Sequence, residues 1–199
     1  MALGISFAIN LEHRLLHAYN IHIWVKGGHA IKKIGILGGS FNPPHLGHLA
    51  IAREAYRRLG LTQVWLLVSP QNPLKSSQDM ADFQHRFELC ELLAQEHPWL
   101  KVSDFEQKHN SPYTAQTLKR LTKEFPDTQF VWLMGSDNLA TIHKWQQWNN
   151  IFQTVPIAVF YRQQVPAAGL HSPAAIKYKK YMKNPREEIG TAPDWRVIM

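Results

Sequence analysis

The chain has 199 residues, of which 45% are hydrophobic and 19% charged, so it is long enough to bury a core and does not read as disordered. Its formal net charge of +7 favours acidic partners, but the basic side chains are spread along the chain, so anionic nucleotides explain the charge as well as nucleic acid does. The single cysteine, Cys90, excludes an intrachain disulfide and a C-x-x-C metal site and indicates a reducing compartment, the cytoplasm.

Residues 1–30 precede the first convincing strand, and we expect them to form an N-terminal extension of a single domain over residues 31–199. His13 and His17 stand four apart and would share a helical face. Because no third ligand stands nearby, a solvated helix is the better interpretation than a metal site. No apolar run reaches the length of a membrane span, which predicts a soluble protein.

After residue 30, apolar runs of strand length alternate with helical patterns. We expect strands at 34–37, 64–68, 102–105, 130–134 and 157–161, with helices at 45–59, 79–96, 112–124 and 138–148. Ser111 is the expected cap of the third helix. This alternation predicts an α/β fold with a Rossmann-like, doubly wound parallel sheet, in which ligands bind at the carboxyl ends of the strands.

The most informative segment, residues 38–48, reads Gly38-Gly39-Ser40-Phe41-Asn42-Pro43-Pro44-His45-Leu46-Gly47-His48 and follows the first strand. Glycines let a backbone approach an anion closely, and a helix that begins near His45 offers unpaired N–H groups. His45 and His48 stand three apart and face one side of that helix. A glycine turn is also common as a purely structural feature, but the coincidence of these signals favours a phosphate site.

Three later segments also fall at strand ends. Lys75 follows a Pro-x-x-Pro loop and is expected to meet polyphosphate. Asp137, after Gly135 and Ser136, either caps the next helix or accepts hydrogen bonds from the hydroxyls of a ribose, and both roles are compatible. Trp145 and Trp148 stand three apart and would ordinarily form one core-facing stripe. An aromatic ring beside a nucleotide cleft can instead stack on a pyridine ring, so we assign Trp148 to the core and Trp145 as the candidate for stacking.

The H-x-G-H signature resembles that of the nucleotidylyltransferases. Further segments over residues 34–162 resemble bacterial nicotinate-nucleotide adenylyltransferase: Pro70 to Lys75, Ser111-Pro112-Tyr113-Thr114-Ala115-Gln116-Thr117-Leu118, and Gly135-Ser136-Asp137-Asn138-Leu139 with Trp145. The resemblance implies adenylyl transfer from ATP to nicotinate mononucleotide, giving deamido-NAD and pyrophosphate. Mg²⁺ would bridge the substrate phosphates.

The resemblance also implies roles for single residues. The ATP phosphates would be held by Ser40, Phe41, His45 and His48. Gly38, Gly39 and Asn42 would belong to the same substrate site, and Asn42 stands where this family often has Asp. Lys75 would hold the polyphosphate tail. Tyr113, Thr114, Asp137 and Trp145, with Gly135, would hold the pyridine nucleotide.

The family's second nucleotide motif, Ser-Ser-Thr-x-Ile-Arg, is expected shortly after Trp195-Arg196-Val197-Ile198-Met199, where the sequence stops. Either the sequence is a truncated form, which we favour, or the protein is catalytically weakened. Two alternatives therefore stay open: a phosphopantetheine adenylyltransferase, which shares the H-x-G-H signature, and a nucleotide-binding module without turnover. Nucleic-acid binding ranks last because it rests on net charge and scattered aromatics.

Overall fold

The computed structural model describes residues 24–26, 29–70, 80–161 and 167–199, and within these ranges no helix has the length and apolarity needed to cross a membrane. Its strands are β1 (Trp24–Lys26), β2 (His29–Gly39), β3 (Gln63–Val68), β4 (Leu100–Ser103), β5 (Thr128–Gly135), β6 (Ile157–Phe160) and β7 (Trp195–Ile198). The sheet order is β4-β3-β2-β5-β6-β7, all parallel, and β1 pairs antiparallel with the start of β2. The predicted parallel α/β fold is confirmed.

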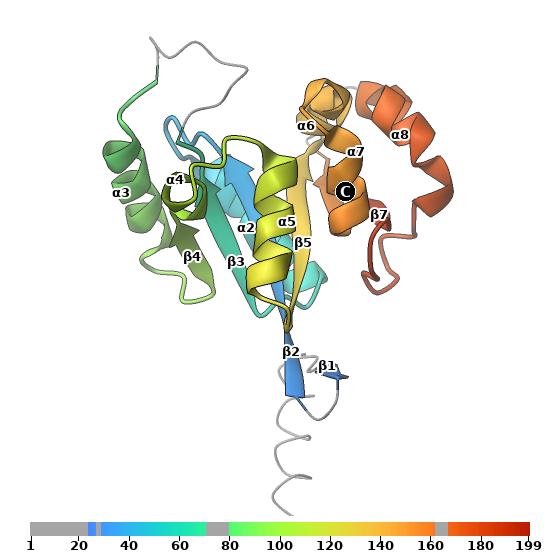
Figure 1. Cartoon of the computed structure of the whole chain (residues 1–199), viewed down its shortest axis with the longest axis horizontal. Helices are drawn as coiled ribbons and strands as arrows, with labels where there is room; N and C mark the ends of the chain where they lie inside the picture. The colour runs from blue at the N-terminus through green and yellow to red at the C-terminus, as the bar shows by residue number, and fades with distance from the viewer. Residues whose placement is uncertain (1–23, 27–28, 71–79, 162–166) are drawn as a thin grey trace, which may run out of the picture.

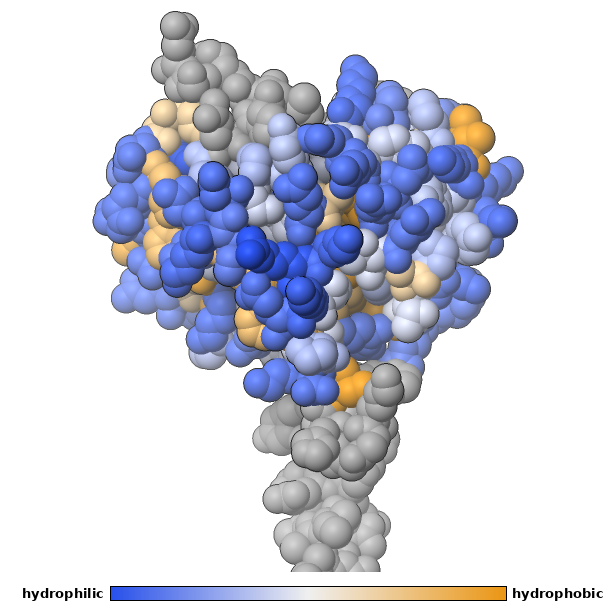
Figure 2. Space-filling view, viewed as in Figure 1, coloured by the Kyte–Doolittle hydropathy of each residue, from blue (hydrophilic) through white to orange (hydrophobic). Residues whose placement is uncertain are grey.

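The helices cover both faces of this sheet (Figure 1). They are α2 (Leu46–Arg58), α3 (Phe83–Ala94), α4 (Phe105–Lys108), α5 (Thr114–Glu124), α6 (Ser136–Thr141), α7 (Trp148–Thr154) and α8 (Pro173–Lys177), with 3₁₀ turns η2 (Ile142–Lys144), η3 (Ala167–His171) and η4 (Lys179–Tyr181). One core lies between the sheet and α5, α7 and α8, and the other between the sheet and α2 and α3. Hydrophilic residues dominate the face shown in Figure 2.

The strand order places a crevice beside β2. The chain first adds β3 and β4 on one side of β2 and then returns to add β5, β6 and β7 on the other side. The connections that leave β2 and β5 therefore diverge at the carboxyl ends of these two neighbouring strands, which is the topological switch point of the fold. The segment 38–48 begins there, as the sequence predicts.

The predicted helix over 138–148 is wrong in its extent. The chain forms α6 and η2, leaves the helical conformation at Trp145 (φ −78°, ψ 145°), and begins α7 at Trp148 after Gln147 in the left-handed region (φ 54°). A continuous helix would place Trp145 and Trp148 on one face. The break instead lets Trp145 pack against Trp132 while Trp148 packs against Phe152 and Tyr178.

Two predicted boundaries are also corrected. The strand predicted at 102–105 lies at Leu100–Ser103, because Leu100 is buried opposite Val64 and the Ser103 hydroxyl accepts the Phe105 N–H at the start of α4. Ser111 does not cap α5, whose N-cap is Tyr113. The Ser111 hydroxyl is buried instead beside the Thr117 hydroxyl, at 3.1 Å.

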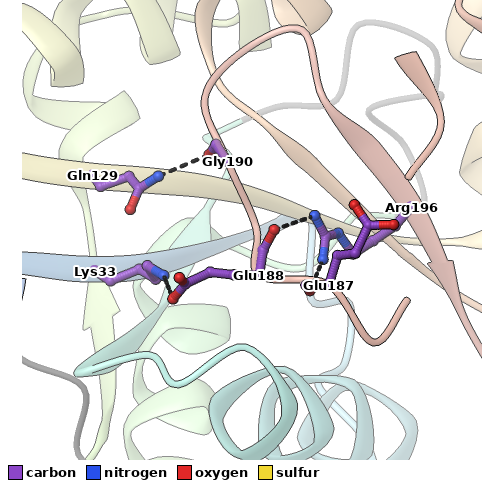
Figure 3. Close-up of polar contacts among 6 residues, drawn as sticks. All are labelled: Lys33, Gln129, Glu187, Glu188, Gly190 and Arg196. Atoms are coloured by element: carbon purple, nitrogen blue, oxygen red, sulfur yellow. Dashed lines mark hydrogen bonds and ion pairs between the residues drawn. The ribbon is translucent and has the colours of Figure 1, made fainter. Parts of the chain in front are cut away.

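The segment that precedes β7 is fastened to the sheet by polar contacts (Figure 3). Lys33 of β2 is 2% exposed and lies 3.4 Å from the Glu188 carboxylate, and Gln129 of β5 donates to the Gly190 carbonyl at 2.8 Å. Arg196 of β7 is fully buried and donates to the carbonyls of Glu187 and Glu188. Burial lowers the pKa of Lys33, with Glu188 opposing this shift. None of these side chains lines the cavity described below.

Candidate active site

A cavity of about 630 Å³ opens at the carboxyl ends of β2 and β5. The site residues predicted from the sequence that line it are Gly38, Gly39, Ser40, Phe41, Asn42, His45, His48, Tyr113, Thr114, Gly135, Asp137 and Trp145. Lys75, the remaining predicted residue, lies outside the described residues. The cavity therefore brings together side chains from segments up to about a hundred positions apart in the sequence.

The phosphate turn, residues 38–42, leads from β2 toward α2. Phe41 adopts the left-handed conformation (φ 46°), which is uncommon for a residue with a side chain. Its ring is buried, 1% exposed, and meets the His48 ring edge-on with the centroids 4.9 Å apart. The Ser69 N–H donates to the Gly39 carbonyl at 3.0 Å, which ties the turn to the end of β3.

Gly38 lines the cavity and also has a role in packing that its sequence context does not predict. It belongs to β2, and a Cβ built at this position would collide with the indole ring of Trp132 on β5. Trp132 itself lines the cavity. Among the glycines that the structure describes, Gly60 has a positive φ and Gly38 and Gly39 do not. The absent side chain at residue 38 thus makes room for a protein ring in the cavity wall.

His45 and His48 form a paired cap at the start of α2. The His45 Nδ1 accepts from the Gly47 N–H at 3.1 Å, and the His48 Nδ1 accepts from the His45 N–H at 3.2 Å. The two rings stack with centroids 3.8 Å apart. Because each Nδ1 is an acceptor, a neutral imidazole at either position carries its proton on Nε2, and both residues line the cavity. Both side chains are therefore held as oriented N–H donors.

The opposite wall of the cavity comes from α5, α6 and the break before α7. Tyr113 is the extended N-cap residue of α5 and Thr114 is its first residue. Asp137 is exposed in the first turn of α6, whose N-cap is Gly135, so Asp137 is not the capping residue. Trp145 is half-buried and meets Trp132 edge-on with centroids 6.5 Å apart. Trp148 does not line the cavity, and its half-buried ring packs against the edge of the core rather than inside it.

Sequence reasoning missed a buried acid in the cavity wall. Glu106 of α4 is 5% exposed, and its carboxylate accepts from the Thr117 hydroxyl at 3.1 Å. Burial raises the pKa of Glu106 to about 7, although hydrogen bonds with Thr117 and Ser69 oppose the shift. The carboxyl group therefore joins α4, α5 and the end of β3. Glu106 stands in a short polar segment, Glu106-Gln107-Lys108, which carries no sequence signal of burial.

Sequence reasoning also missed Arg86, a charged residue within the helix α3. Its side chain is 1% exposed and donates to main-chain carbonyls of the phosphate turn and of neighbouring segments, including those of Ser40 and Ser69, which line the cavity. Burial lowers the pKa of Arg86, with Cys90 and Asp82 opposing this shift. Burial also raises the pKa of Cys90 to about 12, so Cys90 is a thiol at neutral pH. An isolated arginine in a helical pattern reads as exposed, which hides this role.

In the part of the chain that the structure describes, no three His, Cys, Asp or Glu side chains gather in a way that would hold a metal ion. The described carboxylates that line the cavity are Glu106 and Asp137. So few carboxylates would leave a Mg²⁺ ion most of its ligands from phosphates and water, which is how this hard cation is usually bound beside nucleotides. The donor set therefore suits a metal that arrives with its substrate.

A family model described as cytidylyltransferase-like matches residues 36–190. Curated relatives named "Probable nicotinate-nucleotide adenylyltransferase" include one from Parvibaculum lavamentivorans, 51% identical over 72% of this chain and 71% of the relative. Another, from Agrobacterium fabrum, is 47% identical over 83% of this chain and 90% of the relative.

A similar solved structure is the nicotinic acid mononucleotide adenylyltransferase of Plasmodium falciparum complexed with NaAD, at a TM-score of 0.64 over 84% of this chain and 74% of that one. At 18% sequence identity, this structural similarity shows that the two proteins share a fold. The family match spans residues 36–190 and so covers every segment that lines the cavity. The chain belongs to the nicotinate-nucleotide adenylyltransferases, within the cytidylyltransferase-like family.

Proposed function

We propose that this protein transfers the adenylyl group of ATP to nicotinate mononucleotide in NAD biosynthesis, releasing pyrophosphate. The observation that carries the proposal is the cavity in which the phosphate turn and the His45–His48 pair face Tyr113, Asp137 and Trp145. One wall offers N–H donors for phosphate, and the other offers an aromatic ring and a carboxylate for a second nucleotide. A cavity with these two different walls suits a reaction between two nucleotide substrates.

The reaction joins two anions. A phosphate oxygen of the mononucleotide attacks the α-phosphorus of ATP in line, the new P–O bond forms, and the bond to the bridging oxygen of pyrophosphate breaks. No proton has to move, because the nucleophile is already ionised. Positioning and fixed donors are therefore expected to supply most of the rate acceleration.

The chain's own residues divide this work between the two walls. His45 and His48 donate through Nε2 to the α-phosphate, where negative charge increases in the transition state, and Ser40 and Phe41 bind the neighbouring phosphates. Lys144, an exposed cation that lines the cavity, adds a positive charge beside Trp145. Mg²⁺, when bound with ATP, neutralises part of the phosphate charge.

Trp145 stacks on the pyridine ring in this proposal, and Asp137 accepts hydrogen bonds from ribose hydroxyls. Tyr113 and Thr114 complete the pyridine site at the start of α5. The proposal further places the protein in the cytoplasm, in line with a single cysteine that is a free thiol. It keeps an N-terminal extension and a nucleotidylyltransferase domain, but the boundary predicted at residue 30 falls inside β2, which begins at His29, and β1 lies before it. The predicted continuation beyond Met199 stays a prediction.

Pyrophosphate release tests the proposal. The assay contains ATP and Mg²⁺ with nicotinate mononucleotide, nicotinamide mononucleotide or phosphopantetheine, and the His48→Ala variant is run beside the wild type. We expect turnover with nicotinate mononucleotide and a loss of roughly 10²-fold or more in His48→Ala, the usual cost of one transition-state donor. Preference for phosphopantetheine would select the alternative enzyme. ATP binding without turnover on any acceptor would select a nucleotide-binding module.

A further inference from the structure

Arg86 links three segments around the phosphate turn. Its Nη1 donates to the Ser40 carbonyl at 2.5 Å and to the Ser69 carbonyl at 2.9 Å, and its Nη2 donates to the Pro70 carbonyl at 3.0 Å. Its Nε donates to the Ala81 carbonyl, also at 2.9 Å. The guanidinium group of a helix residue thus holds the main chain after β2, after β3 and before α3.

The bond to Ser40 fixes the direction of one N–H group. In a trans peptide the C=O and the following N–H point in opposite directions. Because the Ser40 carbonyl points toward Arg86, the Phe41 N–H of the same peptide group points away from Arg86. No described residue accepts a hydrogen bond from this N–H. Backbone donors rarely stay unpaired, so a ligand acceptor is the natural partner for it.

A second link holds the other side of Phe41. The Ala81 N–H donates to the Asn42 Oδ1 at 3.1 Å, while the carbonyl of Ala81 accepts from Arg86. Phe41, in its left-handed conformation, therefore lies between Ser40, which Arg86 of α3 holds, and Asn42, which is bound to the segment before α3. Such a conformation persists when its surroundings hold it in place. Arg86 is the centre of that support.

We propose that Arg86 is a positioning residue for ATP, because its hold on the Ser40 carbonyl keeps the phosphate turn in the conformation that presents the Phe41 N–H to the polyphosphate. The proposal rests on the proposed function in taking this cavity as the ATP site. Its four hydrogen-bond partners are carbonyl oxygens on three segments, so the planar fork of a guanidinium is required, and the single ammonium group of lysine does not replace it.

Equilibrium binding of MgATP without any acceptor tests the proposal independently of turnover. We compare Arg86→Gln and Arg86→Lys with two controls. His85→Gln changes the exposed neighbour of Arg86, and Arg196→Gln removes the other fully buried arginine, which also donates to main-chain carbonyls but does not line the cavity. We expect the Kd of ATP to rise about tenfold or more in both Arg86 variants and to stay within threefold of wild type in both controls.

The kinetic readout separates positioning from general loss of structure. In folded Arg86 variants, the KM for ATP is expected to rise with the Kd, whereas the KM for the acceptor stays within about threefold. An equal rise in both KM values, a rise that Arg196→Gln reproduces, or full ATP affinity in Arg86→Lys would overturn the proposal. Absence of turnover in the wild type would count against the proposed function alone, because ATP binding is measured separately.

A measurement on the wild type keeps the test independent of how the variants fold. The amide ¹H–¹⁵N resonance of Phe41 is followed by NMR as MgATP is added. We expect the Phe41 signal to shift more than that of Gly60, an amide outside the cavity, and its hydrogen exchange to slow. A Phe41 amide that exchanges at the same rate with and without bound ATP would contradict the proposal.

Discussion

The indole ring of Trp132 lies directly over Gly38, so the strands β2 and β5 meet at the cavity through a glycine and the largest side chain in proteins. A second ring atom of Trp132 stands 3.1 Å from where a Cβ of residue 38 would be, so shifting one atom does not remove the clash. The ring is 2% exposed and packed in the core between the sheet and α5. The shape of the cavity floor therefore depends on this pair.

Gly38→Ala is expected to destabilise the protein by about 1–3 kcal/mol, because overpacking a buried contact displaces the ring. Gly39→Ala is the matched control, since its Cβ would lie 3.5 Å from the Phe41 ring, an ordinary contact. Urea unfolding of both variants measures the difference. In the double variant Gly38→Ala/Trp132→Leu the clash is removed, and the two changes should show a coupling energy of at least about 1 kcal/mol. Additive effects would contradict the close packing.

His45 combines two roles that one substitution pair separates. His45→Ala removes both the Nδ1 acceptor that caps α2 and the Nε2 donor, so we expect a loss of about 1 kcal/mol in unfolding free energy together with a fall of about 10²-fold in turnover. His45→Asn supplies a preferred capping side chain, but its shorter amide has no donor at the position of the imidazole Nε2. The Asn variant should regain the stability but not the turnover, measured by thermal unfolding and pyrophosphate release. Recovery of turnover in step with stability would reduce His45 to a helix cap.

Glu106 gives the stability of the protein a specific pH dependence. Its folded-state pKa, about 7, lies above the ordinary value of 4.5, so the native state binds the proton more tightly than the unfolded chain does. The stabilisation is complete below pH 4.5 and is lost as the pH rises toward 7, by an amount on the order of 3 kcal/mol.

Glu106→Gln removes this titration while keeping an acceptor for the Thr117 hydroxyl. Unfolding free energies at about pH 5 and about pH 8, on either side of the Glu106 titration, are compared for the wild type, Glu106→Gln and the exposed control Glu91→Gln. We expect the fall in stability between the two pH values to be smaller for Glu106→Gln than for the wild type, and to be unchanged in Glu91→Gln. Parallel pH curves for all three proteins would show that Glu106 titrates normally.

The sequence predicted the fold and most of the cavity because both depend on local patterns. Buried parallel strands are near-continuous apolar runs, and Gly38 to His48 follows one of them directly, so its place at the strand end could be inferred. Arg86 and Glu106 could not be found in this way. A buried charged residue looks like an exposed one in a helical pattern, and its partners, such as the Ser40 carbonyl and the Thr117 hydroxyl, are set by tertiary packing.

The break between Trp145 and Trp148 was missed for a related reason. Residues 144–148 contain neither glycine nor proline, so nothing local ends the helix. The Trp145 ring packs beside Trp132 at the cavity, and the Trp148 ring packs beside Phe152 against the core. These two contacts determine where the backbone leaves the helical conformation. Tertiary packing thus overrides helix propensity at this point of the chain.

That separation predicts opposite effects for the two tryptophans. Trp145→Ala should raise the KM for nicotinate mononucleotide by about tenfold or more, since stacking on a base contributes roughly 1–3 kcal/mol. It should lower the unfolding free energy less than Trp148→Ala does, because the Trp145 ring lines the cavity and meets the Trp132 ring alone. Trp148→Ala should lower the unfolding free energy by about 2–4 kcal/mol, because its ring packs against Phe152 and Tyr178 and under the Lys177 ammonium, 5.2 Å from the ring centroid. Its KM for the acceptor should remain near that of the wild type.

Steady-state kinetics and urea unfolding of both variants decide between these roles. Trp145→Phe is the conservative control, because a smaller ring still stacks, and it should recover most of the affinity for the acceptor. The KM for ATP is the internal reference, which neither tryptophan is expected to change by more than about threefold. If Trp148→Ala weakened acceptor binding as much as Trp145→Ala does, the pyridine site would have to extend to α7, and the assignment of Trp148 to the core would be wrong.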